Sequence, residues 1–151
     1  MNQRTAVRMP AGEVAALLAA GHKLQVATIN PDGTPHLVTM FYGLRDARIA
    51  FWTYRTSQKA RNLARDPRLS CLVEDGDGYF ELRGVQVTGV VRTVRDLAGI
   101  TEIGRLVAAR MPGGPPSGAL EEYVERAARK RVAYLVEPRR TVSWDHRRLL
   151  T

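Results

Sequence analysis

The amino-acid sequence predicts a mainly β protein (α+β), an antiparallel β-barrel with a few short flanking helices. Short apolar strands follow one another with few helices between them, whereas a parallel α/β sheet requires strands and helices to alternate. Two glycines, Gly84 and Gly89, lie inside one long strand pattern, as the bulges or corners of a small closed barrel require. No G-x-G-x-x-G motif occurs, so a dinucleotide-binding Rossmann fold is disfavoured.

Length and composition favour one domain, spanning residues 1–151. The chain is long enough to bury its own core, and its 44% apolar and 25% charged residues are ordinary values for a globular protein. No repeat or linker divides it. No run of about 18 apolar residues and no signal pattern occur, so no membrane association is expected. The single cysteine, Cys71, cannot form an internal disulfide, which favours a cytoplasmic location.

The first half of the chain is predicted to contain two helices and three strands. The first helix covers residues 13–20 and ends at Gly21. Three strands follow, and a proline- and glycine-containing turn joins the first two; the strands cover residues 24–29, 37–42 and 48–54, the last reached through a connection at 44–47. Ser57 is a good N-cap for the second helix, and Pro67 biases Asp66 away from helical geometry, so this helix is expected to end there.

The second half is predicted to begin and end with strands, with two helices between them. A strand at 69–73 and a turn at 75–78 lead to a strand pair or one bent strand at 79–94. Asp96 can cap a helix whose apolar stripe runs from Leu97 to Val107. The Pro- and Gly-rich residues 111–116 break this helix, Ser117 is expected to cap another, and strands at 132–136 and 141–144 close the chain.

The start of the Ser57 helix is a candidate anion site. The first amides of a helix have no intrahelical partner, and Arg55 and Lys59 flank them with positive charge. Lys59 and Asn62 are three residues apart and are expected to share a face, opposite the apolar Leu63. A capped surface helix with ordinary basic residues explains the same local pattern, so the spacing alone leaves both interpretations open.

The chain is strongly basic, with a net charge of +8 and a pI near 10.4. Twenty of its 23 basic residues are arginines, which suit the fork geometry of phosphates and carboxylates. Three explanations compete: a nucleic-acid surface, a groove for a polyanionic small molecule, or a GC-rich coding sequence. The last explains the preference for arginine but not the sign of the net charge.

No catalytic residue and no metal site are expected from the side-chain chemistry. Cys71 lies in an apolar strand, where burial keeps a thiol unreactive, and no G-x-S-x-G elbow occurs. The three histidines are far apart without ligand-like spacing. Asp145 and His146 form the one plausible acid–base pair, for which an ordinary surface role is the default. This chemistry is compatible with an enzyme whose cofactor performs the reaction.

Several motifs resemble the pyridoxamine 5'-phosphate oxidase-like split β-barrel proteins, and most closely their branch that uses the deazaflavin coenzyme F420. The central one is the pattern Arg/Thr/Ser-x-Lys-x-Arg-Asn-Leu followed by Arg-Asp-Pro-Arg, which here occupies residues 55–63 and 65–68. Further matches are Ala27-Thr28-Ile29-Asn30-Pro31-Asp32-Gly33-Thr34-Pro35-His36, Glu81-Leu82-Arg83-Gly84 and the C-terminal residues 142–149. The resemblance covers nearly the whole chain, from about Gly21 to Leu149.

The resemblance implies a homodimer with each cofactor between two subunits. It also implies an oxidoreductase that transfers a hydride from reduced F420 to a small organic acceptor. The residues expected to hold the phosphate and the anionic tail are Arg55, Thr56, Ser57, Lys59, Arg61 and Asn62. Thr39 and Met40 are expected to line the deazaflavin ring, although periodicity cannot distinguish this role from plain barrel core.

Residue Gln58 and the length of the basic track bear on the choice of cofactor. FMN-binding relatives often have Ser-Arg-Lys at the phosphate, and here the middle residue is Gln58. FMN carries one terminal phosphate, whereas F420 carries a phosphodiester and a polyglutamate tail. The basic residues Arg55, Lys59 and Arg61 form a basic track. If this track continues to Arg65 or Arg68, it is longer than one phosphate requires. The sequence therefore favours F420, with FMN as the alternative.

Two further classes of function remain as rivals of an enzyme. One is a non-catalytic carrier of flavin, deazaflavin or haem with the same fold. The other is a basic barrel that binds nucleic acid, which is disfavoured because the basic segments lack interleaved exposed aromatic residues. No nucleic-acid partner is therefore expected.

Overall fold

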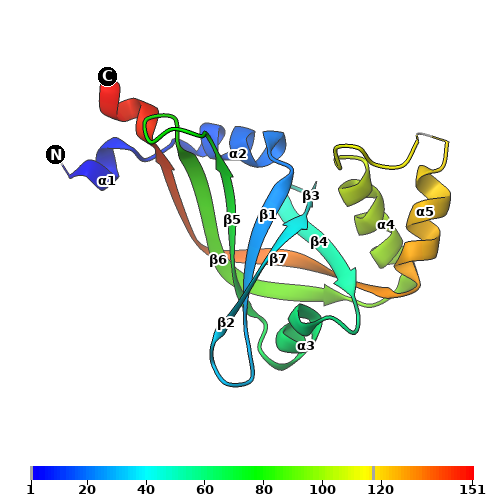
Figure 1. The fold of residues 1–151 in the computed structure, drawn as a ribbon. Coiled ribbons are helices and arrows are strands. Elements are labelled where there is room, and N and C mark those ends of the chain that lie inside the picture. Colours follow the sequence, from blue (N-terminus) through cyan, green and yellow to red (C-terminus); the bar gives the residue numbers. More distant parts are fainter. Residues whose placement is uncertain (1, 117) are drawn as a thin grey trace.

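The computed structural model describes residues 2–116 and 118–151, and its centre is one seven-stranded antiparallel sheet (Figure 1). The sheet order is β2-β1-β5-β6-β7-β4-β3, and each pair of neighbours is antiparallel. The strands are β1 (Lys23–Ile29), β2 (Pro35–Phe41), β3 (Gly43–Arg45), β4 (Arg48–Tyr54), β5 (Arg68–Asp75), β6 (Arg83–Val94) and β7 (Arg131–Asp145). Figure 1 shows the long strands β6 and β7 bending strongly, so that the sheet curls into a half-barrel. The predicted mainly β split barrel with short helices is confirmed.

The helices lie around three parts of this sheet. Helices α1 (Gln3–Ala6) and α2 (Ala11–Ala20) lie near the 3₁₀ helix η1 (His146–Leu150), at the end where both termini are found (Figure 1). Helix α3 (Gln58–Arg65) lies at the opposite end, below the sheet in the view of Figure 1. Helices α4 (Leu97–Ala108) and α5 (Leu120–Ala128) form a pair beside β4 and β7. No helix among the described residues is long and apolar enough to cross a membrane.

The sheet separates two apolar cores. One core fills the inside of the curled sheet, and the other lies between the sheet and the α4–α5 pair. Strand β4 contributes to both, because successive residues of a strand point to opposite faces. Ile49 and Phe51 join the first core, whereas Ala50 and Trp52 join the second. This two-sided burial explains why β4 is a continuous apolar run and not an alternating pattern.

The two strand glycines have different roles. Gly89 is confirmed as a bulge, since the β6–β7 register shifts between Thr88 and Gly89. Gly84 is instead in regular register, where the indole of Trp144 packs directly on its backbone; an added Cβ would lie 2.2 Å from a ring carbon. Only a glycine fits below this ring.

Three predicted boundaries differ from the structure. Strand β6 begins at Arg83 and not at residue 79, because its pairing with β5 starts at Arg83 and leaves residues 76–82 as the connecting loop. The two predicted C-terminal strands form the single strand β7, which accommodates Pro138 opposite the Gly89 bulge. The connection predicted at 44–47 contains the short strand β3 and a tight turn at Asp46–Ala47. The predicted cap Ser117 lies outside the described residues; α5 begins at Leu120 after Ala119.

Candidate functional site

The start of helix α3 has the geometry that the sequence predicts. Ser57 is its N-cap, with an extended backbone and a hydroxyl Oγ that accepts a hydrogen bond from the Ala60 amide at 3.2 Å. The first intrahelical bond runs from the Arg61 amide to the Ser57 carbonyl, at 3.1 Å. The helix ends at Arg65, and Asp66 is extended, as expected of the residue before Pro67. The amides of Gln58 and Lys59 precede the first intrahelical bond and point out of the helix end.

Arg55 and Arg61 are exposed at this helix start, and backbone carbonyl groups hold both guanidinium groups. Arg55 Nη2 donates to the Arg129 carbonyl at 2.9 Å, and Arg61 Nη2 donates to the Thr56 carbonyl at 2.9 Å. A guanidinium has five N–H groups, so each arginine keeps donors for a ligand. Thr56 is exposed between them. Arg55, Thr56, Ser57, Lys59 and Arg61 are thus brought together within one turn and its cap.

Lys59 is half-buried, and no hydrogen bond or ion pair holds its ammonium group within the described ranges 2–116 and 118–151. Burial, together with repulsion from the cation of Arg131, lowers the pKa of Lys59 below the usual lysine value. A desolvated ammonium beside a second cation is the electrostatic environment that an anion would stabilise.

Arg131, at the start of β7, is the neighbour that the sequence analysis missed. It pairs with Tyr54 across the β4–β7 ladder, which places residues 129–131 beside the strand end that leads into α3. The run Arg129-Lys130-Arg131 is visible in the sequence, but it also fits the C-terminal end of a helix, where positive charge complements the macrodipole. The strand pairing, and not the local sequence, brings this run to α3.

The cations around the start of α3 form a cluster without carboxylate partners, which we call the α3 basic cluster. Its members are Arg55, Lys59, Arg61 and Arg131. The ion pairs found between described residues use other basic residues, namely Arg45, Arg68, Arg83, Arg105, Arg126, Arg147 and Arg148. The cluster therefore presents positive charge that the protein itself does not neutralise.

Asn62 is fully buried and lies on the apolar side of α3. Its Nδ2 donates to Thr28 Oγ1 and to Asn30 Oδ1, both at 3.0 Å, and its Oδ1 accepts from Gln58 Nε2 at 2.9 Å. The expectation that Asn62 shares a face with Lys59, opposite Leu63, is wrong, because Asn62 and Leu63 are both buried. In this arrangement Asn62 links α3 to the β1–β2 hairpin. Its contact with a cofactor stays a prediction.

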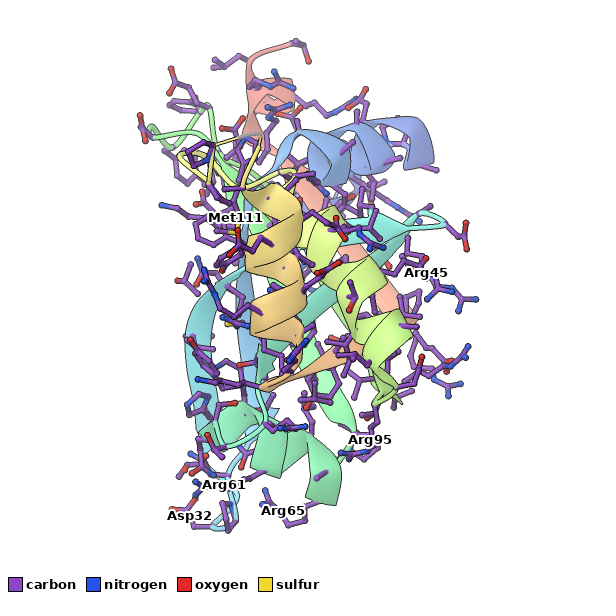
Figure 2. All side chains as sticks on the ribbon, turned by 90° about the vertical axis from the view of Figure 1, so that its right-hand side faces the viewer. Asp32, Arg45, Arg61, Arg65, Arg95 and Met111 are labelled. Carbon is purple, nitrogen blue, oxygen red and sulfur yellow. The ribbon has the colours of Figure 1, made fainter. Side chains whose placement is uncertain are left out.

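The basic track continues along α3 to Arg65 but not to Arg68. Arg65 donates to the carbonyl of Ile29 in the β1–β2 hairpin and has no ion pair among the described residues, whereas Arg68 forms an ion pair with Asp66 at 2.7 Å. Figure 2 shows Arg61 and Arg65 extending from α3 at the same end of the molecule as Asp32, in the loop of that hairpin. Arg131, at the start of β7, adds a further cation to the track.

The two predicted ring-lining residues lie on opposite faces of the edge strand β2. Thr39 is on the exposed outer face, where its hydroxyl donates to Gln25 Oε1 at 2.7 Å. Met40 faces inward and packs against the first core. A flat ring on one face of β2 could therefore contact only one of these two side chains within a single subunit.

The Asp145–His146 pair does not form. Asp145 is buried and paired with Arg147, which holds the pKa of its carboxyl below the usual range. His146 Nδ1 lies 2.8 Å from the Tyr79 carbonyl instead. The end of β7 and the 3₁₀ helix η1, to which these residues belong, lie at the end of the sheet remote from α3 (Figure 1). Cys71 is buried, and burial raises the pKa of its thiol. Within the described part of the chain, no group of three or more His, Cys, Asp or Glu residues could hold a metal ion.

Comparisons with known proteins place this geometry in a family. The family model described as pyridoxamine 5'-phosphate oxidase matches residues 11–145. A conserved hypothetical protein from Mycobacterium tuberculosis has a similar solved structure, with 40% identity, a TM-score of 0.89, and coverage of 100% of this chain and 94% of the other. No curated protein sequence matches significantly.

Two more distant structures with the same fold bind different ligands, according to their names. An F420 reductase is 25% identical with a TM-score of 0.61, and the alignment covers 83% of this chain and 93% of that one. HutZ, a haem storage protein from Vibrio cholerae, is 16% identical with a TM-score of 0.69 and coverage of 88% and 94%, a likeness that shows the fold alone. Proteins with this fold thus include one named as an F420 reductase and one named as a haem storage protein. The family match, with the curled antiparallel sheet, shows that this chain belongs to the pyridoxamine 5'-phosphate oxidase-like split-barrel family.

Proposed function

We propose that this protein is an oxidoreductase that uses reduced coenzyme F420 to transfer a hydride to a small organic acceptor. The observation that carries the proposal is the α3 basic cluster, which offers four cations without a carboxylate partner between described residues. A single phosphate requires two or three cationic contacts, whereas a phosphodiester with a polyglutamate tail distributes several charges. The likeness to an F420 reductase, at 25% identity, supports the same choice.

The residues at α3 fit the anionic part of such a cofactor. The free amides and the hydroxyl of Ser57 can donate to phosphate oxygens, and Arg55 and Arg61 are held in place by carbonyl groups before any ligand arrives. Lys59 adds an ammonium that is already desolvated. When bound, the deazaflavin supplies the hydride chemistry, and the chain supplies binding, orientation and electrostatics.

We further infer a homodimer, because the central rows of the outer face of the sheet are poor in charge. One row across this face runs from β2 to β7 through directly opposed residues: Thr39, Gln25, Leu72, Gln86 and Val142. The adjacent row runs through Leu37, Ala27, Ser70, Thr88 and Arg140. Only one of these ten side chains is charged, in a chain with 25% charged residues. A two-fold contact of this face would bring a second subunit beside the exposed side of β2, where Thr39 lies.

Separate titrations of the purified protein with F420, FMN and haem test the proposed function. We expect F420 to bind most tightly, and NADPH-independent oxidation of reduced F420 to follow when an acceptor is present. Tighter binding of FMN would replace the proposal with an FMN-dependent oxidase or reductase of the same fold. Tight binding of any of the three without turnover would indicate a carrier.

A further inference from the structure

The guanidinium group of Arg131 occupies an aromatic site beside α3. Its central carbon lies 4.2 Å from the ring centroid of Tyr54 and 4.7 Å from that of Trp52. Stacking on two rings fixes the plane of the guanidinium group, so little conformational entropy is left to lose when a ligand binds. Trp52 is buried and itself fixed by the second core, whereas Tyr54 is half-exposed, with 53% of its surface accessible.

One donor of this guanidinium group is left without a partner. The Nε atom of Arg131 is buried and has no hydrogen-bond acceptor, and no ion pair between described residues involves Arg131. A buried donor without an acceptor costs stability unless something else satisfies it. An anion placed along the edge formed by Nε and one Nη would satisfy this donor, because that edge presents two parallel N–H groups to a carboxylate or phosphate.

The start of α3, which carries Lys59, lies beside the start of β7, because Tyr54 pairs with Arg131 and the Arg55 amide donates to the Lys130 carbonyl at 3.1 Å. Arg131 is the charged residue whose repulsion contributes to the lowered pKa of Lys59, so the two cations interact through space, although they lie on different elements. Neither is neutralised by a carboxylate in the described residues. Two neighbouring cations that repel one another, one of them with an unsatisfied donor, are stabilised together by a single negative group between them.

We propose that Arg131 is an anion-binding residue of the site, and that Arg131 and Lys59 hold the same negatively charged group of the ligand. This inference rests on the proposed function, which it extends from the turn before α3 to the start of β7. The binding site would then consist of two segments far apart in sequence, joined by the pairing of Tyr54 with Arg131. The phosphodiester of F420 has the chemistry required, and so does the phosphate of FMN.

The test compares ligands with and without the negative group. Wild type and Arg131→Gln are titrated with F420, with FMN, and with the deazaflavin ring that lacks the phosphodiester and tail. Arg131→Gln should weaken F420 binding by about 10- to 100-fold, the effect of losing a charge-assisted hydrogen bond, and should leave binding of the uncharged ring unchanged. Arg131→Lys, which keeps the charge but not the planar fork, should lose less F420 affinity than Arg131→Gln.

Arg4→Gln is the matched control, because it removes the same charge from α1, at the opposite end of the molecule (Figure 1). It should change F420 affinity by less than about twofold. Melting temperatures of all variants identify any that fail to fold. If Arg131→Gln fails to fold, the F420 affinity of wild type is compared with that of Arg131→Lys, which keeps a long aliphatic stem over the two rings.

The outcomes separate this inference from the proposed function. If wild type binds F420 and Arg131→Gln binds it equally well, the inference is overturned while the proposed function stands. An equal loss for the uncharged ring would mean that Arg131 acts through the packing of Trp52 and Tyr54, which also overturns it. If wild type prefers FMN and Arg131→Gln weakens FMN, the inference stands and the F420 function falls. Binding of neither cofactor overturns both.

Discussion

Lys59 has a half-buried ammonium group that no protein group among the described residues neutralises. Replacing it with alanine should weaken F420 binding by roughly 10- to 150-fold, which corresponds to the loss of one charge-assisted hydrogen bond of about 1.5–3 kcal/mol. The stability of the apoprotein should change by less than about 0.5 kcal/mol, since the side chain makes no interaction that the fold needs. Titration of the cofactor and urea unfolding measure the two effects, and an unchanged Kd would remove Lys59 from the site.

The lowered pKa of Lys59 also predicts how binding depends on pH. Burial and Arg131 shift this pKa downward, so the ammonium group loses its proton at a lower pH than an ordinary lysine does. Because an anionic ligand binds the protonated form, affinity should be constant at neutral pH and fall as pH rises through the lowered pKa. Lys59→Arg should abolish this fall, since arginine keeps its charge at these pH values. Arg131→Gln removes the repulsion and should move the fall to higher pH. Kd measured between neutral and alkaline pH checks both shifts.

At the scale of the elements, the sequence predicts well whatever depends on near neighbours. The Ser57 cap, the end of α3 before Pro67 and the Gly89 bulge follow from local backbone chemistry, and all three are confirmed. The connection predicted at 44–47 does contain a turn at Asp46–Ala47, but its tight hairpin conformation was not predicted, for a physical reason. Asp46 and Ala47 have φ values of 49° and 64°, a left-handed conformation that a sequence usually marks with glycine. Neither residue is a glycine, so the sequence contains no glycine that would mark this left-handed turn.

The candidate site was predictable only on the α3 side. Arg55, Thr56, Ser57, Lys59 and Arg61 are close in sequence, and the structure groups them. The inward direction of Asn62 depends on Thr28 and Asn30, which precede it by more than 30 residues. Arg131 reaches the site through the β4–β7 ladder. Such contacts depend on the sheet order, which no local pattern of the chain encodes.

The position of Asn62 leads to a prediction about α3 as an element. Asn62→Ala would leave the buried Thr28 hydroxyl and the half-buried Asn30 and Gln58 amides without these hydrogen bonds and should cost about 1–3 kcal/mol of the free energy of unfolding. Gln58→Ala is the control, because it removes only one of these bonds at a half-buried position. Urea unfolding measures the loss. Equal stability of Asn62→Ala and wild type would show that the hydrogen bonds to the β1–β2 hairpin do not stabilise α3.

At the scale of the whole molecule, charge is the first property to test. The net charge of +8 and the uncompensated α3 basic cluster should attract an anionic cofactor over distance. Screening shortens this attraction to about 10 Å at 0.1 M salt, so F420 affinity should decrease steadily as salt is raised. The uncharged deazaflavin ring should bind equally at all salt concentrations. A Kd for F420 that does not depend on salt would mean that the cluster lies away from the ligand.

The last prediction concerns the outer face of the sheet, where a subunit partner would complete the ring site. Two features of the central rows of this face favour burial: a single charged residue, and large apolar side chains that are exposed in the single chain, with Leu37 69% and Val142 37% accessible. A stable two-fold contact should bury well over about 1,000 Å² in total, an area that several sheet rows can provide. Sedimentation velocity should therefore show a dimer.

Leu72 lies at the centre of the row that joins Thr39 to Val142, so Leu72→Glu would place two carboxylates near the two-fold axis and should give monomers. Leu97→Glu, at an exposed position on α4, should remain dimeric. If the cofactor ring needs both subunits, the Leu72→Glu monomer should also bind F420 more weakly, although its α3 basic cluster is intact. A monomer that binds with full affinity would show that one subunit forms the complete site.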